Sequence, residues 1–157
     1  KQSPDFIQRR IIASGMRPIN NIVDITNYVM LEYGTPQHAF DLDKLNNYLC
    51  VRYAKQGETL VTIDEVERNL NEQSVVIATK ECPVCAGGVF GGLNSEIDSN
   101  SKNIALEAAY FTPHTIIWAA AEIRGHLSAA SLATGPLMSV PFVSPVSVVM
   151  TAALSSK

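Results

Sequence analysis

His38 is one of two ionisable side chains in this sequence whose setting suits catalysis. It lies in the segment Pro36-Gln37-His38-Ala39-Phe40-Asp41, between a proline turn and an apolar pair. Unperturbed histidine titrates at about pH 6.5, so it can act as a base, hold a water molecule or donate a hydrogen bond to a carbonyl group. The alternative is a structural histidine that is hydrogen-bonded at a turn.

Glu107 is the second such side chain, because it is the one charged residue in the apolar run 103–111. A buried carboxylate is costly unless it has a partner. We therefore expect Glu107 either to face a polar pocket or to pair with a base such as Arg17. A purely structural ion pair is the alternative to a functional role.

Two glycine pairs, Gly87-Gly88 and Gly91-Gly92, bracket Val89-Phe90. This spacing predicts either a tight bend or a backbone that another group must approach closely. Backbone N–H groups in such a cluster could bind an oxygen atom. The cluster matches neither the Gly-x-Gly-x-x-Gly pattern nor the P-loop, which argues against a nucleotide site.

The three cysteines indicate a reducing compartment, because they are odd in number and too few for a disulfide framework. Cys82-Pro-Val-Cys85 has the spacing of a redox or half-zinc motif, but no second pair completes it, and none of the three histidines is at metal-ligand spacing from it. We interpret these cysteines as ordinary strand or loop thiols and expect no metal site. The spacing of the remaining residues predicts no serine triad.

The elements that must position these residues point to an α+β fold with a mixed sheet or barrel-like β core and flanking helices. Ser3-Pro4-Asp5 is typical of the start of a helix, and Gly15 is typical of its end. The next apolar run fits either a helix or a mixed pattern, with the helix slightly favoured, and Gly34-Thr35-Pro36 ends it. We expect helices over about residues 4–14, 22–32 and 112–124, and strands over about 49–54, 58–63, 75–78, 83–90 and 103–111.

A chain of 157 residues and 17.0 kDa fits one domain, and its 46% hydrophobic content fits a globular core. The net charge of −3 argues against a domain whose affinity comes mainly from neutralising nucleic-acid phosphates, although a neighbouring domain could hold such a substrate. Of the 27 charged residues, 26 lie in residues 1–124 and none in 125–156. This abrupt loss of charge distinguishes the composition of the C-terminal segment from that of the rest of the chain.

The two ends of the sequence carry separate expectations. The first ten residues lack the pattern of a signal peptide, and the start on lysine suggests a piece of a longer chain. The uncharged C-terminal segment is interrupted by three prolines, and its longest proline-free apolar stretch, Val146–Leu154, is too short to span a bilayer. We expect no membrane partner, and residues 132–157 to form a strand or a loosely ordered tail.

Longer motifs add a resemblance to this interpretation. Four motifs carry it, and they follow one another along the chain. The first two are Arg17-Pro-Ile-Asn-Asn-Ile-Val-Asp-Ile-Thr-Asn-Tyr-Val-Met-Leu-Glu32 and Gly34-Thr-Pro-Gln-His-Ala-Phe-Asp41, and the last two are Ala86-Gly-Gly-Val-Phe-Gly-Gly92 and Leu106-Glu-Ala-Ala-Tyr-Phe111. In this order they resemble the B3/B4 editing domain of bacterial phenylalanyl-tRNA synthetase β chains. The resemblance covers about residues 3–131, so we expect a B3/B4 editing domain over 1–131 and a divergent segment over 132–157.

The resemblance implies a function and a set of site residues. In that family the domain hydrolyses tyrosine from mischarged tRNA(Phe), because a pocket for phenylalanine rejects an added hydroxyl imperfectly. Glu107 matches the glutamate that recognises the tyrosine hydroxyl, and His38 matches a histidine of the editing pocket. We expect both to be catalytic residues, and His38 to position water ahead of acting as a strict general base. The substrate-binding residues implied by the family are Arg17, Asn21, Thr26, Gly88, Gly91, Ser128 and Ala130.

The resemblance also implies partners and cofactors. The parent ligase is a cytoplasmic assembly of two α and two β chains, and its ATP and magnesium belong to the synthetic site on the α chain. This domain would need no cofactor for hydrolysis and would not aminoacylate tRNA by itself.

The family pattern ends early in this sequence. After Ser131, the residues Leu132-Ala-Thr-Gly135 replace the charged stretch that the family carries there. A non-catalytic tRNA-binding or structural module of the same synthetase is therefore the alternative function. A free-standing enzyme on another small ester is a further alternative.

Overall fold

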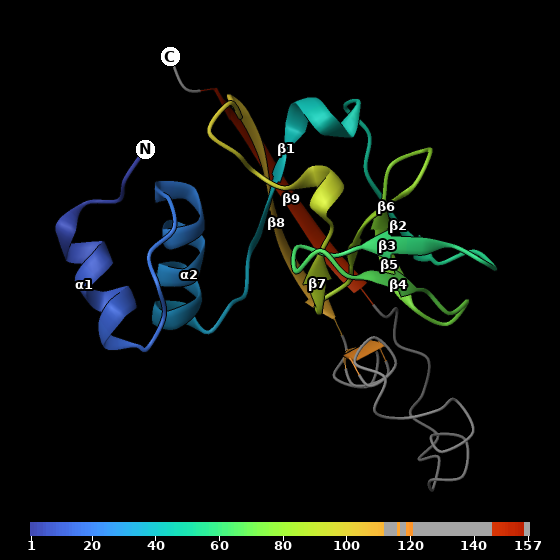
Figure 1. Ribbon diagram of the computed structural model, residues 1–157, viewed down its shortest axis with the longest axis horizontal. Coiled ribbons are helices and arrows are strands. Elements are labelled where there is room, and N and C mark those ends of the chain that lie inside the picture. Colours follow the sequence, from blue (N-terminus) through green and yellow to red (C-terminus); the bar gives the residue numbers. More distant parts are fainter. Residues whose placement is uncertain (112–115, 117–118, 121–145, 156–157) are drawn as a thin grey trace, which may run out of the picture. The chain divides into compact units, whose positions relative to one another are not determined.

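The structure is a computed structural model that describes residues 1–111, 116, 119–120 and 146–155, with only the backbone for the last range (Figure 1). The described residues fall into two compact units. The first comprises Lys1–Lys44 and Ile97–Ala109 with strand β9 from Val148 onwards, and the second comprises Leu45–Glu96 with the end of strand β8.

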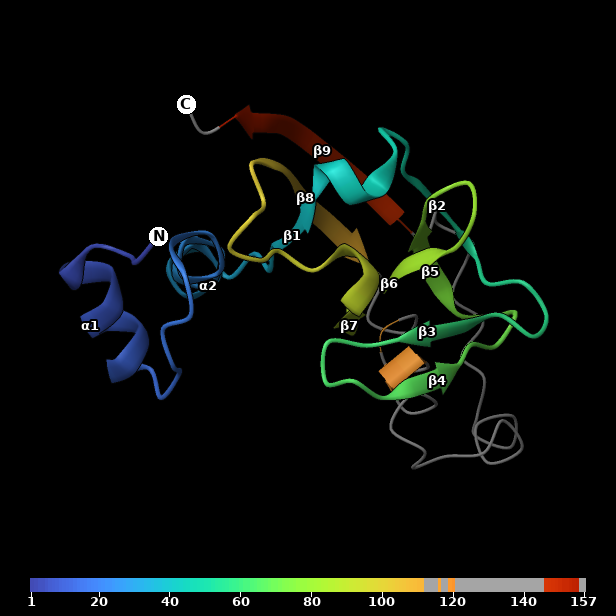
Figure 2. The same cartoon turned by 45° about the horizontal axis from the view of Figure 1, so that its top comes forward.

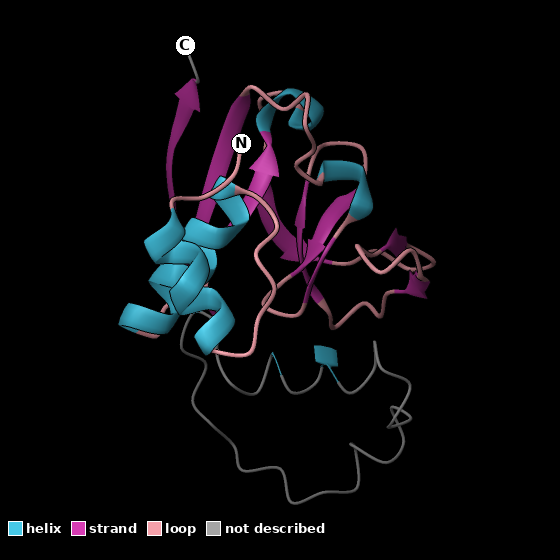
Figure 3. Ribbon diagram, turned by 60° about the vertical axis from the view of Figure 1, so that its left-hand side comes forward, coloured by secondary structure: helices cyan, strands magenta, loops and turns pink. Residues whose placement is uncertain are grey.

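The first unit begins with two helices, α1 (Asp5–Ala13) and α2 (Asn21–Tyr33), which pack together and are the longest of the helices drawn in cyan in Figure 3. Asn20 caps α2, because its side-chain oxygen accepts hydrogen bonds from the N–H groups of Ile22 and Val23, both at 3.0 Å. Gly34 ends α2 in a left-handed conformation with a φ of 70°. Both helices agree with the sequence-based prediction to within about a residue at each end, with Pro4 at the N-cap of α1.

Asp24 is the polar centre of this helical part. Its side chain is only 1% exposed, and its two carboxylate oxygens accept hydrogen bonds from Ser3 Oγ at 2.5 Å and from the Ile19 N–H at 2.8 Å. These bonds join the N-terminal segment, the turn before α2 and α2 itself. A buried carboxylate with two donors is therefore a structural element of this unit.

The sheet of the first unit has the strand order β1–β8–β9, with β1 at His38–Asp41, β8 at Asn103–Phe111 and β9 at Val146–Ser155. Strand β1 is antiparallel to β8 and is followed by a 3-10 helix at Leu42–Leu45. Strand β9 covers the proline-free apolar stretch of the C-terminal segment. Strand β1 was not predicted, because Pro36 and the short run after it read as a turn.

The second unit holds a four-stranded sheet of order β2–β5–β6–β7 and a separate hairpin of β3 and β4 (Figure 2). Every residue of β5 and β6 is buried, as expected of central strands. The strands are β2 Cys50–Tyr53, β3 Thr59–Val61, β4 Glu67–Asn69, β5 Val75–Ala78, β6 Pro83–Ala86 and β7 Phe90–Gly91, followed by a 3-10 helix at Leu93–Ser95.

The structure confirms the α+β class. The strand pairs whose registers are defined are antiparallel, and the described strands form open sheets with no closed barrel. Residues 83–91 form two strands joined by a turn at Gly87-Gly88, where a single strand over 83–90 was expected, and β4 lies where no strand was expected. The expected helix over 112–124 lies almost wholly outside the described residues.

We predict that Asp24→Ala lowers the free energy of unfolding by about 3 kcal/mol, because it removes two buried hydrogen bonds to a carboxylate and leaves their donors unpaired. Urea unfolding followed by circular dichroism measures this change. Glu32→Ala is the matched control, since Glu32 is half exposed and forms a surface ion pair with Arg10 at 3.5 Å. The control should change stability by less than about 1 kcal/mol, and an equal loss in both variants would contradict the assigned role of Asp24.

Candidate functional site

The register of β1 against β8 places His38 directly opposite Glu107. Residues that face each other in an antiparallel pair project from the same side of the sheet, with Cβ atoms about 5 Å apart. The two side chains that the sequence suggested for chemistry, 69 positions apart in the chain, are therefore neighbours. The structure brings these two candidates together within the first unit.

Polar contacts beyond the far end of β1 hold this register. Asp41 Oδ2 accepts a hydrogen bond from Ser101 Oγ at 2.6 Å, just before β8 begins. Asp43 Oδ1 accepts another from Asn103 Nδ2 at 3.0 Å, and Lys44 Nζ lies 3.1 Å from Asp98 Oδ2. These contacts link the chain around β1 to the chain around β8 and so fix which residue faces Glu107.

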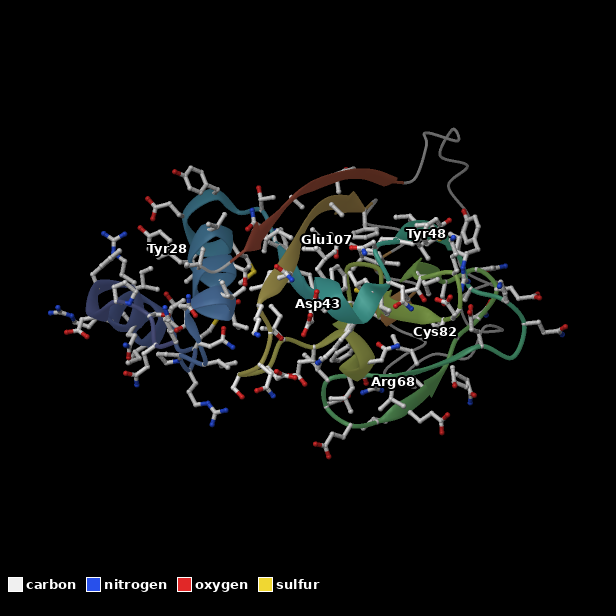
Figure 4. The ribbon with its side chains drawn as sticks, turned by 90° about the horizontal axis from the view of Figure 1, so that it is seen from above. Tyr28, Asp43, Tyr48, Arg68, Cys82 and Glu107 are labelled. Atoms are coloured by element: carbon white, nitrogen blue, oxygen red, sulfur yellow. The ribbon has the colours of Figure 1, made fainter. Side chains whose placement is uncertain are left out.

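Glu107 is a buried acidic residue in the middle of strand β8. Its residue is 5% exposed, and among the described residues its Oε2 atom has no hydrogen-bond partner. Burial in this apolar strand raises the pKa of Glu107 to about 7, because the charged form loses its hydration. Figure 4 shows Glu107 on β8. Near neutral pH the side chain is therefore a mixture of carboxylic acid and carboxylate.

The expected ion pair with Arg17 is not formed. Arg17 is exposed in the turn before α2, and no ion pair joins it to Glu107 among the described residues. The other expectation for Glu107, that it faces a polar pocket, is met only in part: a histidine lies opposite it across the strand pair, and no cation does.

His38 is half-buried beside a second ring. The ring centroids of His38 and Phe40 are 4.6 Å apart and their planes meet at 74°, an edge-to-face contact. Burial lowers the pKa of His38 below its usual value of 6.5. The imidazole is consequently neutral at physiological pH, where one nitrogen can donate a hydrogen bond and the other can accept one.

This pair of side chains can perform a definite kind of chemistry. An unpaired carboxyl group in an apolar setting binds a hydroxyl or another polar group strongly, because the ligand supplies the missing hydrogen bond. A neutral imidazole next to it can hold a water molecule for attack on an electrophile. The arrangement therefore places a group able to bind a polar ligand beside a group able to hold water.

Three expected binding residues lie in the turn before α2 and in that helix. Asn21 begins α2, and its backbone N–H donates to the Lys1 carbonyl at 2.9 Å. Thr26 is buried, and its hydroxyl donates to the Val23 carbonyl at 2.8 Å, so the hydroxyl proton is already used within the helix. Arg17 remains exposed. The structure does not join any of these three to the His38–Glu107 pair by a hydrogen bond.

The two expected glycines belong to the second unit. Gly88 has a φ of +73° in the β6–β7 turn, and a Cβ atom there would lie 3.1 Å from side-chain atoms of both Phe111 and Ile116. Gly91 is buried in β7, where its carbonyl accepts a hydrogen bond from the Ile63 N–H at 3.1 Å. The glycine cluster therefore forms a tight bend with close packing. Ser128 and Ala130, the last two expected binding residues, lie outside the described residues.

Sequence reasoning missed Phe40, Asp24 and the strand that carries His38. The spacing of two positions between His38 and Phe40 was a signal, because side chains two positions apart in a strand lie on the same face. The described part of the chain contains no group of three or more metal-ligating side chains, and its three cysteines are free thiols. None of its helices has the length and apolar character needed to cross a membrane.

We predict that Glu107→Gln stabilises the protein selectively at high pH. In the wild type the folded state holds the Glu107 proton more tightly than the unfolded state, so stability from this group falls as pH rises from 4.5 through about 7. Glutamine cannot ionise, so the difference in unfolding free energy between variant and wild type should grow by about 3 kcal/mol between pH 4 and pH 8.5. Chemical denaturation at both pH values measures it.

The control for this experiment is Glu67→Gln, an exposed position in β4. That variant should follow the wild-type pH dependence. Parallel curves for Glu107→Gln and the wild type would show that Glu107 is not held in an apolar setting.

Comparison with known proteins identifies the family of the chain. The family model for the B3/4 domain matches residues 1–133. The chain is 52% identical over 116 residues to a protein named phenylalanine–tRNA ligase beta subunit from Fusobacterium nucleatum, with 74% of this chain and 14% of the relative covered.

A protein of the same name from Carboxydothermus hydrogenoformans is 49% identical, with 73% of this chain and 14% of the relative covered. Another from Aquifex aeolicus is 51% identical, with 74% of this chain and 15% of the relative covered. The chain thus spans about one seventh of the length of these relatives. The extent of the family match shows that the chain belongs to the B3/4 domain family.

Proposed function

We propose that this chain is the editing module of a phenylalanine–tRNA ligase β subunit and hydrolyses the ester that joins tyrosine to tRNA(Phe). The observation that carries the proposal is the buried carboxyl group of Glu107 opposite His38, whose Oε2 atom has no hydrogen-bond partner among the described residues. The names of the relatives supply the setting, since each is a phenylalanine–tRNA ligase beta subunit.

The proposed recognition step uses the missing hydrogen bond of Glu107. The phenolic hydroxyl of tyrosine is a donor and an acceptor, so it can satisfy the carboxyl group in either protonation state. Phenylalanine lacks that hydroxyl and would leave the carboxyl group unpaired. An unmade buried hydrogen bond costs about 1–3 kcal/mol, which corresponds to a preference for tyrosine of about ten- to a hundredfold.

The proposed hydrolysis step uses His38 to place the attacking water. The neutral imidazole accepts a hydrogen bond from the water, whose oxygen forms a new bond to the ester carbonyl carbon. The bond between that carbon and the ribose oxygen then breaks, and the ribose oxygen takes up a proton. The products are free tyrosine and intact tRNA, and correct placement alone supplies much of the acceleration.

The proposal extends to the partners of the parent enzyme. The substrate is tRNA(Phe) mischarged with tyrosine, and the α chain completes a cytoplasmic assembly of two α and two β chains. ATP and magnesium serve the synthetic site on the α chain, and hydrolysis by this module uses water as its only co-substrate.

We predict that Glu107→Ala abolishes the preference for tyrosine. The test uses the ligase assembly whose β subunit carries this sequence, because the chain spans about one seventh of the relatives' length. Release of amino acid from Tyr-tRNA(Phe) and Phe-tRNA(Phe) is measured in parallel. The ratio of the two rates should fall about ten- to a hundredfold in the variant.

The control for selectivity is Glu67→Ala, which removes an exposed carboxylate from β4. An unchanged rate ratio in Glu107→Ala would contradict the recognition role. Absence of tyrosine release above the buffer rate in the wild-type assembly would contradict editing altogether and would favour the non-catalytic tRNA-binding alternative.

We predict a different signature for His38→Ala. Loss of the water-positioning group should lower kcat for Tyr-tRNA(Phe) hydrolysis about a hundredfold while the preference for tyrosine over phenylalanine stays close to wild type. Single-turnover deacylation separates the two quantities. If the variant loses selectivity and keeps its rate, the roles assigned to His38 and Glu107 are reversed.

A further inference from the structure

We propose that Phe40 is a positioning residue that holds the His38 imidazole away from Glu107 and so keeps the Glu107 carboxyl group free for a ligand. The inference rests on the proposed function only for the identity of that ligand. Its structural content concerns three side chains on one face of the β1–β8 strand pair.

The position of Phe40 is fixed by the same register that pairs His38 with Glu107. Phe40 follows His38 by two residues, so both side chains project from the same face of β1. Its partner on β8 is Ala105, which has only a methyl group to offer. The Phe40 ring is 1% exposed and is therefore held firmly by its surroundings.

The His38 ring is engaged with Phe40 and makes no bond to Glu107. The two rings meet edge to face at 4.6 Å, whereas Glu107 Oε2 has no hydrogen-bond partner among the described residues. A histidine directly opposite a carboxyl group could instead turn toward it and form an ion pair, because an imidazolium–carboxylate pair would satisfy the hydrogen bonding of both side chains. The aromatic contact favours the rotamer in which this pair is not made.

The described charges on the elements next to β1 do not explain the separation. Helix α2 packs against β1, but its Asp24 binds Ser3 and Ile19, and its Tyr28 and Glu32 contact Arg10. Asp41, the other titratable residue of β1, projects from the opposite face, and β9 carries no ionisable residue at all. On β8, Glu107 is the one charged side chain. Burial lowers the pKa of His38 and raises that of Glu107.

The consequence is a pair of groups kept apart and ready for different tasks. Glu107 retains an unsatisfied oxygen for the hydroxyl of the ligand, and His38 retains a neutral imidazole for water. Without the Phe40 ring, the imidazole can turn toward Glu107, take up a proton and occupy the recognition group. A bulky aliphatic residue at position 40 should therefore convert a free site into a closed ion pair.

The test is an NMR titration of His38 in the 157-residue chain and in three variants. Phe40→Leu should raise the proton affinity of His38 at least tenfold, because a nearby carboxylate stabilises the imidazolium. The double variant Phe40→Leu/Glu107→Gln should abolish that rise, since the new partner is then gone. Ile104→Ala, which removes a buried side chain from the opposite face of the same sheet, should leave His38 unchanged.

A second measurement does not depend on the folding of the Phe40 variant. In the otherwise wild-type chain, Glu107→Gln should change the proton affinity of His38 less than threefold, because the two groups are not paired. A tenfold or larger decrease would show that they are paired already and would overturn the proposal, as would an unchanged His38 titration in folded Phe40→Leu.

These titrations separate the proposal from the proposed function. They need no tRNA, so a failure of Tyr-tRNA(Phe) hydrolysis would not decide the role of Phe40. The His38 titrations alone decide it. In the ligase assembly, Phe40→Leu should also lower the preference for tyrosine, and Phe40→Tyr, which keeps the ring, should restore it. Full selectivity in Phe40→Leu would contradict a role for Phe40 in keeping Glu107 free.

Discussion

The candidate site depends on one constraint, the register between the short strand β1 and the long strand β8. Because side chains alternate along a strand, a slip of one residue would turn Glu107 away from His38 and bring Ala108 or Leu106 into its place. Strand β1 has only four residues, so its own ladder cannot guarantee the register. The polar contacts of Asp41 and Asp43 with the residues at the start of β8 supply the missing restraint.

An energetic conflict is built into the site that this register creates. A buried carboxyl group without a partner destabilises the folded state at and above neutral pH, and the fold tolerates the cost through interactions elsewhere. In the helical part of the first unit, Asp24 shows the opposite solution, with a buried carboxylate bound by two donors. The contrast between Asp24 and Glu107 separates a structural acid from one that is left available to a ligand.

Much of the fold follows from local sequence patterns, and the site follows from them only in part. The polar cap at Asn20 and the glycine at position 34 mark α2 clearly, and the β-branched run of β5 is unambiguous. Strand β1 could not be predicted from the sequence, because four residues after a proline are too few to show a clear alternation of apolar and polar side chains. The acid in an apolar run singled out Glu107, whereas of the two alternatives for its surroundings the described residues do not show the ion pair with Arg17.

Pairing across 69 positions is a tertiary property that no window of sequence contains. The resemblance to a known family predicted that His38 and Glu107 belong to one site, and the register makes them neighbours. It gave no role to Phe40, whose contact with His38 appears only once β1 is seen as a strand. Residues that act through a neighbour, such as Phe40, carry no chemical signature of their own.

The most direct measurement is a crystal structure of the chain with a non-hydrolysable tyrosyl-adenosine analogue in which an amide replaces the ester. The account predicts that the phenolic oxygen lies within about 3.2 Å of a Glu107 carboxyl oxygen and that a water near His38 faces the carbonyl carbon. A complex in which the phenol points away from Glu107, while its Oε2 stays unpaired, would contradict the central claim that this carboxyl group is the recognition element.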